Sequence, residues 1–137
     1  MGYDRAMNGK ESPDKIVPTY EIDLSAAWDT VSYAEIFLEQ IKRLPFYRTG
    51  LLYSGFDADD VGKTSGSREL KGAIWCSQES DITGGEHGRK ESAVQHAMHY
   101  ERGIIAVYDG AKMIPLGDEY AYKPKDGALV ALVHLKA

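Results

Sequence analysis

Histidine, cysteine and aspartate side chains are the first candidates for chemistry in this sequence. His96 and His99 are three residues apart in His-Ala-Met-His, whereas the zinc-protease helix needs two histidines four apart with a glutamate after the first. We therefore expect this pair to bind no metal tightly and His99 to face solvent. Cys76 is the only cysteine, with no base beside it, which argues against a disulfide and a nucleophilic thiol. The acidic run at 57–60 lacks the glycine and the final glutamate of a calcium loop.

Three short segments carry a more informative pattern. The first, at 51–55, is Leu-Leu-Tyr-Ser-Gly, an apolar run that ends in a small residue and a glycine. The second, at 71–77, is Lys-Gly-Ala-Ile-Trp-Cys-Ser, which ends near an aromatic residue and precedes a loop and a predicted helix. The third, at 117–122, is Gly-Asp-Glu-Tyr-Ala-Tyr, a turn that gives a strand an acidic start. Their order and spacing, more than any one of them, distinguish the chain.

In these segments the chain resembles the ADP-ribosyltransferase superfamily, the fold of diphtheria-type toxins and poly(ADP-ribose) polymerases. Members carry a His or Arg followed by Gly at the end of a first strand, and an aromatic or Ser-rich segment on a second. A helix follows, and a catalytic Glu begins a late strand. The resemblance covers residues 50–135 and implies an α+β fold, a small split β-sandwich with two flanking helices. It implies NAD as a substrate.

The resemblance also implies catalytic residues. Glu119 matches the catalytic glutamate, which would hydrogen-bond the nicotinamide ribose and stabilise the positive charge that develops as the glycosidic bond breaks. Ser54 stands at the first-strand position of the His or Arg, and it cannot make the same contact. Arg48, in Phe-Tyr-Arg-Thr, is the alternative cation for that role.

Four further residues would bind NAD if the resemblance holds. Trp75 matches the aromatic residue that stacks on the nicotinamide ring, and Gly55 matches the glycine whose backbone approaches the amide. Tyr53 precedes that pair of small residues, and we expect 53–55, Trp75 and Glu119 to converge on one pocket. Ser77 would be the serine of the arginine–serine–glutamate branch if Arg48 is the first-strand cation. The departure at Ser54 leaves open transfer of ADP-ribose, hydrolysis of NAD, or neither.

Hydrophobic periodicity predicts the elements that must hold these residues. Ser32 and Glu35 form a capping box, which predicts a helix over 33–44. A second helix is predicted over 90–102, with Gly103 directly after it and Glu101 in the middle of its apolar stripe.

Short strands are predicted after the first helix and again after the second. Because strands and helices do not alternate regularly, the pattern indicates an α+β class. We expect the strands at 50–55, 72–76, 104–108, 113–116, 119–122 and 128–135. The last of these is apolar at both sets of alternate positions, so we expect a central strand that is paired on both sides and buried on both faces.

Length and charge bound the remaining possibilities. A chain of 137 residues has room for one hydrophobic core. The formal net charge of −5 argues against binding to a nucleic-acid backbone. Residues 1–18 are polar, carry no signal-peptide pattern and read as a flexible tail or linker, so we expect a single catalytic-type domain over 19–137.

These observations favour an NAD-using ADP-ribosyltransferase or NAD glycohydrolase. We expect a delivered domain of a bacterial toxin or effector that acts in the cytoplasm of a target cell, or otherwise a cytoplasmic protein. Its partners would be NAD, a protein or other acceptor of ADP-ribose, and a cognate inhibitor protein, with neither a metal nor a membrane. One alternative is a non-enzymatic binding or inhibitory module of the immunity or phage-encoded kind. The other is a hydrolase or nuclease that uses His96, His99 and Glu101.

Overall fold

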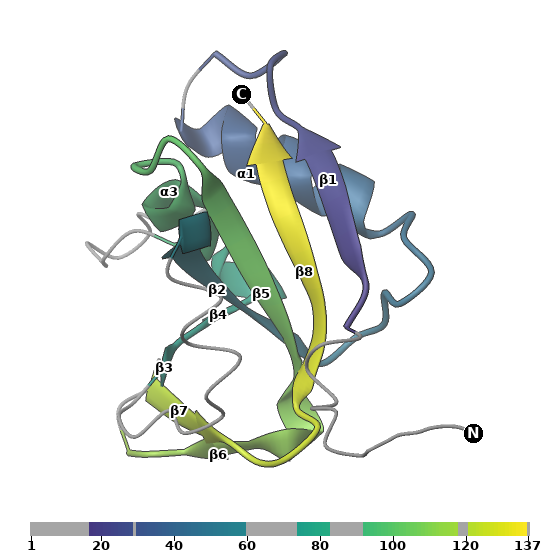
Figure 1. Cartoon of the computed structure of the whole chain (residues 1–137), viewed down its shortest axis with the longest axis vertical. Coiled ribbons are helices and arrows are strands. Elements are labelled where there is room, and N and C mark those ends of the chain that lie inside the picture. The colour runs from purple at the N-terminus through teal and green to yellow at the C-terminus, as the bar shows by residue number, and fades with distance from the viewer. Residues whose placement is uncertain (1–16, 29, 60–73, 83–91, 118–120, 137) are drawn as a thin grey trace.

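Two β-sheets and two α-helices make up the described chain in a computed structural model (Figure 1). The structure describes residues 17–28, 30–59, 74–82, 92–117 and 121–136. The helices are α1 (Thr30–Ile41) and α3 (Ala93–Ala97). One sheet has five strands and is mixed, and the other has three antiparallel strands, so the predicted α+β class is confirmed. Neither helix is long and apolar enough to cross a membrane.

The larger sheet has the strand order β1-β8-β5-β2-β4. Its strands are β1 (Thr19–Asp23), β2 (Leu51–Asp57), β4 (Ser77–Gln78), β5 (Gly103–Asp109) and β8 (Leu129–Lys136). β8 pairs in parallel with β1 and antiparallel with β5, which confirms that the last strand is central and paired on both sides. Only one of its faces is fully covered: Ala131, Val133 and Leu135 are buried in the core that includes α1, whereas Leu132 and His134 are half-buried. The expectation of a strand buried on both faces is therefore wrong.

The smaller sheet has the order β3-β7-β6 and covers part of the face opposite the helices. Its strands are β3 (Ile74–Trp75), β6 (Met113–Pro115) and β7 (Ala121–Pro124). Ile74 and Met113 pack with side chains of the larger sheet in a second hydrophobic core, whose other buried members are Leu52, Cys76, Ala106, Tyr108 and Ala128. In Figure 1 this sheet lies at the lower end of the view, away from α1.

β1 was not predicted from the sequence. In its five residues, Tyr20 and Ile22 alternate with exposed Glu21 and Asp23, a period of two that marks a half-buried strand. The pairing that holds β1 is with β8, more than a hundred residues away, and nothing in a local window indicates it. The first hydrogen bond of this region comes before the strand, from the Leu132 amide to the Pro18 carbonyl at 3.0 Å.

The predicted second helix is too long. Ser92 and Gln95 form a capping box, so α3 begins at Ala93. It ends at Ala97 because the chain turns back there: a Cβ on Gly103 would lie 2.1 Å from the Ala97 carbonyl oxygen. Gly103 is thus the first residue of β5 and not a helix cap.

Two smaller helix predictions are also wrong. Glu101 lies in the turn between α3 and β5 and is exposed, because no helix reaches it, so it belongs to no apolar stripe. α1 begins at Thr30, so Ser32 lies inside the helix and does not cap it.

Val133→Ala tests the packing of the central strand. The valine side chain has no exposed surface, so we expect the truncation to lower the free energy of unfolding by about 2 kcal/mol. Ile114→Ala is the control, because this β6 side chain is 41% exposed and should cost less than about 1 kcal/mol. Urea unfolding followed by circular dichroism measures both. Equal losses would contradict the placement of β8.

Candidate functional site

The two sheets separate between β2 and the segment that contains β3 and β4. The β2–β4 ladder runs from Leu52–Gln78 to Tyr53–Ser77, and two residues before Ser77 the chain belongs to the smaller sheet instead. Beyond the last ladder pair, the Ser54 hydroxyl donates a hydrogen bond to the Trp75 carbonyl at 2.7 Å. The structure thus joins the predicted first-strand serine to the backbone of the predicted second-strand tryptophan.

Trp75 is the predicted NAD-binding residue that offers most surface. Its side chain is 49% exposed although it is a large aromatic residue in a strand. Directly opposite it in β7 stands Ala121, whose carbonyl accepts a hydrogen bond from the Leu116 amide at 3.0 Å. Glu119, the predicted catalytic acid, precedes Ala121 by two residues in sequence and lies outside the described residues.

Tyr53 offers no surface to a ligand. Adjacent residues of a strand point to opposite faces, and Tyr53 points toward the helices, where its ring meets Phe37 edge-on with centroids 5.7 Å apart. The residue is completely buried, and its hydroxyl has no hydrogen-bond partner among the residues that the structure describes. Burial raises the pKa of this phenol well above its usual range. The ring therefore acts as a core side chain in this conformation, and the structure does not bring it together with Trp75 at a surface.

Gly55 and Ser77 both contact α3. A Cβ on Gly55 would lie 2.4 Å from the Ala93 carbonyl oxygen, so the absence of a side chain permits close approach of the helix backbone. The Ser77 hydroxyl is buried and accepts a hydrogen bond from the Ala93 amide at 2.9 Å. A helix of the protein itself approaches Gly55, and the expected approach of the Gly55 backbone to nicotinamide stays a prediction.

Arg48 lies away from the split between the sheets. Its guanidinium forms an ion pair with Asp109 at 3.4 Å, and Asp109 stands opposite Leu51 at the start of β2. Ser54 is three residues further along that strand, a distance of about 10 Å. The two alternatives for the first-strand role, Ser54 and Arg48, are therefore not neighbours, and only Ser54 touches β3.

The sequence did not predict a polar cluster formed by Lys42, Tyr47 and Glu79. The Tyr47 hydroxyl donates to Glu79 Oε1 at 2.6 Å, and the Lys42 ammonium lies 3.3 Å from Glu79 Oε2. The hydrogen bond to the carboxylate raises the pKa of Tyr47. The cluster fastens the chain after α1 to the segment after β4. Glu79 follows Ser77 by two residues, so the spacing of a strand would put both side chains on the same face. No local pattern in the sequence indicates that Lys42 and Tyr47 contact Glu79.

The histidine pair lies on the surface, with His96 in the last turn of α3 and His99 just after the helix. His96 and His99 are both exposed, as expected for His99, with ring centroids 6.2 Å apart. The Tyr100 hydroxyl lies 3.3 Å from His96 Nε2. Within the described ranges, no three His, Cys, Asp or Glu side chains gather as potential metal ligands.

Comparison of the chain with protein-family models, curated proteins and solved structures gives no match.

Tyr53→Phe and Tyr47→Phe should change stability in opposite directions. The Tyr53 hydroxyl is solvated in the unfolded chain and has no partner within the described part of the fold, so its removal should raise the free energy of unfolding by about 1 kcal/mol. Tyr47→Phe removes the bond to Glu79 and should lower it by about 1 kcal/mol. Urea unfolding at neutral pH measures both. A loss of stability in Tyr53→Phe would mean that the hydroxyl has a partner.

The Cys76 thiol should react slowly in the folded protein. Burial raises its pKa to about 12, so the reactive thiolate is scarce at pH 8. Stability that depends on the protonated thiol is complete below the ordinary pKa of 9.0 and is lost as pH rises toward 12. We expect labelling by a chromogenic disulfide reagent to be at least about 100-fold slower in native than in urea-unfolded protein. Similar rates in both states would contradict the burial.

Proposed function

We propose that the protein is an NAD-using enzyme, either an ADP-ribosyltransferase or an NAD glycohydrolase. One observation carries the proposal: half-exposed Trp75 stands where the two sheets separate, with its carbonyl bound by Ser54 and with Ala121 opposite. Glu119 precedes Ala121 by two residues. Ser54, Trp75 and Ala121, from three segments far apart in sequence, are therefore neighbours. These segments follow one another in the order that the ADP-ribosyltransferase resemblance implies.

The finer fold in this proposal is a split β-sandwich of the ADP-ribosyltransferase type. Two features support it: the large and small sheets share a core that includes Leu52 and Ile74, and they separate beyond the Tyr53–Ser77 pair. α1 and α3 pack on the other face of the large sheet, consistent with two flanking helices.

The chemistry would be cleavage of the bond between nicotinamide and ribose. Trp75 would stack on the nicotinamide ring, which leaves with the electron pair of the broken bond. The Glu119 carboxylate would stabilise the positive charge that develops on the ribose. Water or an acceptor group then attacks the ribose carbon and loses a proton, which gives hydrolysis or transfer.

In this proposal the other predicted site residues hold the site in position. Ser54 is a positioning residue, because its hydroxyl holds the Trp75 carbonyl. Gly55 and Ser77 keep α3 against the sheet, and Arg48 anchors the start of β2 through Asp109. Tyr53 fills the core beneath them. As a delivered effector domain, the protein would have an ADP-ribose acceptor and a cognate inhibitor protein as partners.

Release of nicotinamide from NAD, measured by chromatography, tests the proposal. Glu119→Gln keeps the shape of the side chain and removes its charge, so we expect the rate to fall by about 100-fold or more. The melting temperature should hardly change, because an acid that faces substrate contributes roughly 0–1 kcal/mol to folding. Trp75→Ala should also lower the rate, and Trp75→Phe should keep part of it because a ring remains.

Glu101→Gln is the matched control, since it removes an exposed acid outside the proposed site. Its rate should equal that of the wild type. If Glu119→Gln released nicotinamide at the wild-type rate, the protein would use NAD but Glu119 would not be its catalytic acid. No release of nicotinamide by the wild type would favour the non-enzymatic binding module instead.

A further inference from the structure

The outer face of the small sheet combines lysine and aliphatic side chains. Ile114 and Lys123 are directly opposite each other in the β6–β7 ladder, so their side chains share a face. The register continues on both sides of this pair: the Lys125 amide bonds the Lys112 carbonyl, and the Leu116 amide bonds the Ala121 carbonyl. Leu116 directly follows β6 and Lys125 directly follows β7, whereas Lys112 ends the 3-10 turn that precedes β6. We define the basic sheet face as the exposed side chains of Lys112, Ile114, Leu116, Lys123 and Lys125.

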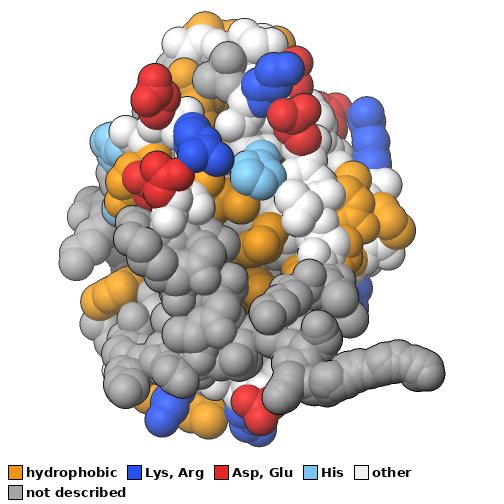
Figure 2. All heavy atoms as spheres, in the orientation of Figure 1, with side chains coloured by type: hydrophobic (Ala, Val, Ile, Leu, Met, Phe, Trp, Pro, Cys, Tyr) orange, Lys and Arg blue, Asp and Glu red, His pale blue; other side chains and the backbone are white. Residues whose placement is uncertain are grey.

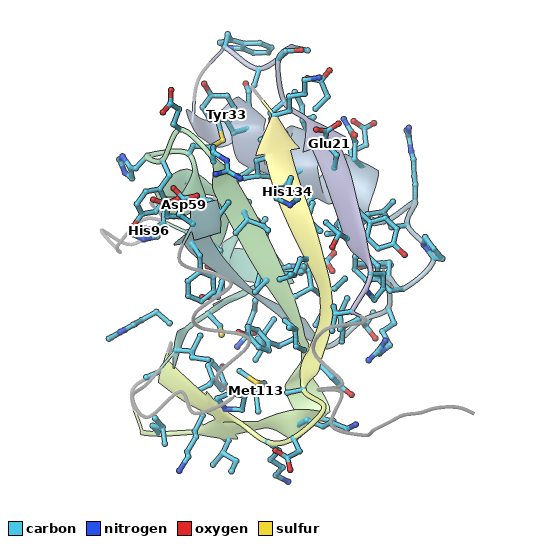
Figure 3. The ribbon with its side chains drawn as sticks, viewed as in Figure 1. Glu21, Tyr33, Asp59, His96, Met113 and His134 are labelled. Carbon is cyan, nitrogen blue, oxygen red and sulfur yellow. The ribbon has the colours of Figure 1, made fainter. Side chains whose placement is uncertain are left out.

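This basic sheet face is open to solvent. Ile114 is 41% and Leu116 47% exposed, and the three lysines are exposed too. Met113, between Lys112 and Ile114, points the other way into the protein (Figure 3). Figure 2 shows basic and hydrophobic side chains together at the lower end of the molecule, beside an acidic group.

The arrangement of the lysines is unfavourable for the isolated protein. The backbones of Lys112 and Lys125 are adjacent, since the Lys125 amide bonds the Lys112 carbonyl at 2.9 Å, and like charges near each other repel. No ion pair between described residues involves any of the three. Asp126, in the turn after β7, is the acid next to Lys125 in sequence. Among the described residues, this end of the protein carries three exposed lysines and one exposed acid, Asp126, beside exposed aliphatic side chains.

Against the expectation from the sequence that the protein has no membrane partner, we propose that the basic sheet face docks on an anionic lipid bilayer. Lysines near the surface of an anionic leaflet are attracted by its negative potential, and adjacent aliphatic side chains can enter the boundary between headgroups and acyl chains. The cores of protein–protein interfaces are instead depleted of lysine. Sequence-tolerant binding of single-stranded nucleic acid relies on several aromatic rings that stack successive bases. Among the described residues this face exposes one aromatic ring, Trp75 in β3, and the side chains beside the lysines are aliphatic Ile114 and Leu116.

Docking through this face is independent of NAD chemistry. Trp75 lies on the same face of the sheet but in the other edge strand, β3, and it is not needed for contact with lipid. Binding to vesicles is therefore measured without NAD, and its failure would leave the proposed enzymatic activity untouched.

Co-sedimentation of the full chain with vesicles tests the proposal. We compare vesicles of phosphatidylcholine alone with vesicles that contain about 30% phosphatidylserine, at about 0.1 M salt. Wild type should bind the anionic vesicles and release them at about 1 M salt, where charges are screened within about 3 Å. Lys112→Gln, Lys123→Gln and Lys125→Gln together should lower partitioning about 100-fold, roughly fivefold for each charge.

Two further variants separate the contributions. Ile114→Gln with Leu116→Gln keeps the lysines and should lower partitioning at least about tenfold, by removing the aliphatic part. The control, Arg43→Gln, Arg102→Gln and Lys136→Gln, removes three exposed charges elsewhere and should bind like the wild type.

Three results would overturn the proposal. The first is no binding of the wild type to anionic vesicles, and the second is an equal loss of binding in the control triple variant. The third is binding to a single-stranded oligonucleotide without binding to vesicles, which would identify a polyanion site. Circular dichroism of each variant ensures that lost binding does not reflect unfolding.

Discussion

The hydrogen bond from Ser54 to the Trp75 carbonyl marks the constraint on which this architecture depends. One short segment, from Ile74 to Gln78, contributes to both sheets, so its backbone must leave one ladder before it joins the other. Where two strands separate, backbone groups lose their ladder partners, and a buried carbonyl without a partner is costly. The Ser54 side chain supplies the missing donor. The small sheet can then diverge from the large one while the Trp75 carbonyl keeps a hydrogen-bond donor.

The short helix α3 packs closely against β2, β4 and β5 near the point where the sheets separate. Gly55 and Gly103 lack a side chain where the carbonyl oxygens of Ala93 and Ala97 approach, and the Ser77 hydroxyl accepts from the first amide of the helix. Two small residues on β2 and β5 thus allow a five-residue helix to pack closely. A helix of that length would not be stable alone. Its stability therefore comes from the sheet beneath it.

Charge is distributed unevenly over this framework. Glu79 is held by Tyr47 and Lys42 near the end of α1, and Arg48 and Arg102 each pair with an aspartate. The lysines of the small sheet have no such partners among the described ion pairs. If the small sheet docks on an anionic surface as proposed, its lysines would orient the approach of the molecule. The two proposals, an NAD site at the split and a lipid-docking face on the small sheet, thus concern adjacent parts of one sheet.

The sequence by itself determined those features that depend on local pattern. Alternating and continuous apolar runs predicted β2, β5 and β8, and the central position of β8 followed from its apolar character. α1 followed from helical spacing, with its start and its end both placed three residues too late. Only the tertiary structure decided what depends on distant partners. β1 exists because β8 accepts it in parallel, α3 is short because Gly103 must turn back against Ala97, and Tyr53 is a core residue because α1 covers its face. The same holds for the site: sequence singled out Ser54, Gly55, Trp75 and Ser77 by their order, but whether a small residue meets a ligand or a helix depends on what packs against it. In this fold Gly55 and Ser77 meet α3, and only Trp75 keeps a large exposed surface.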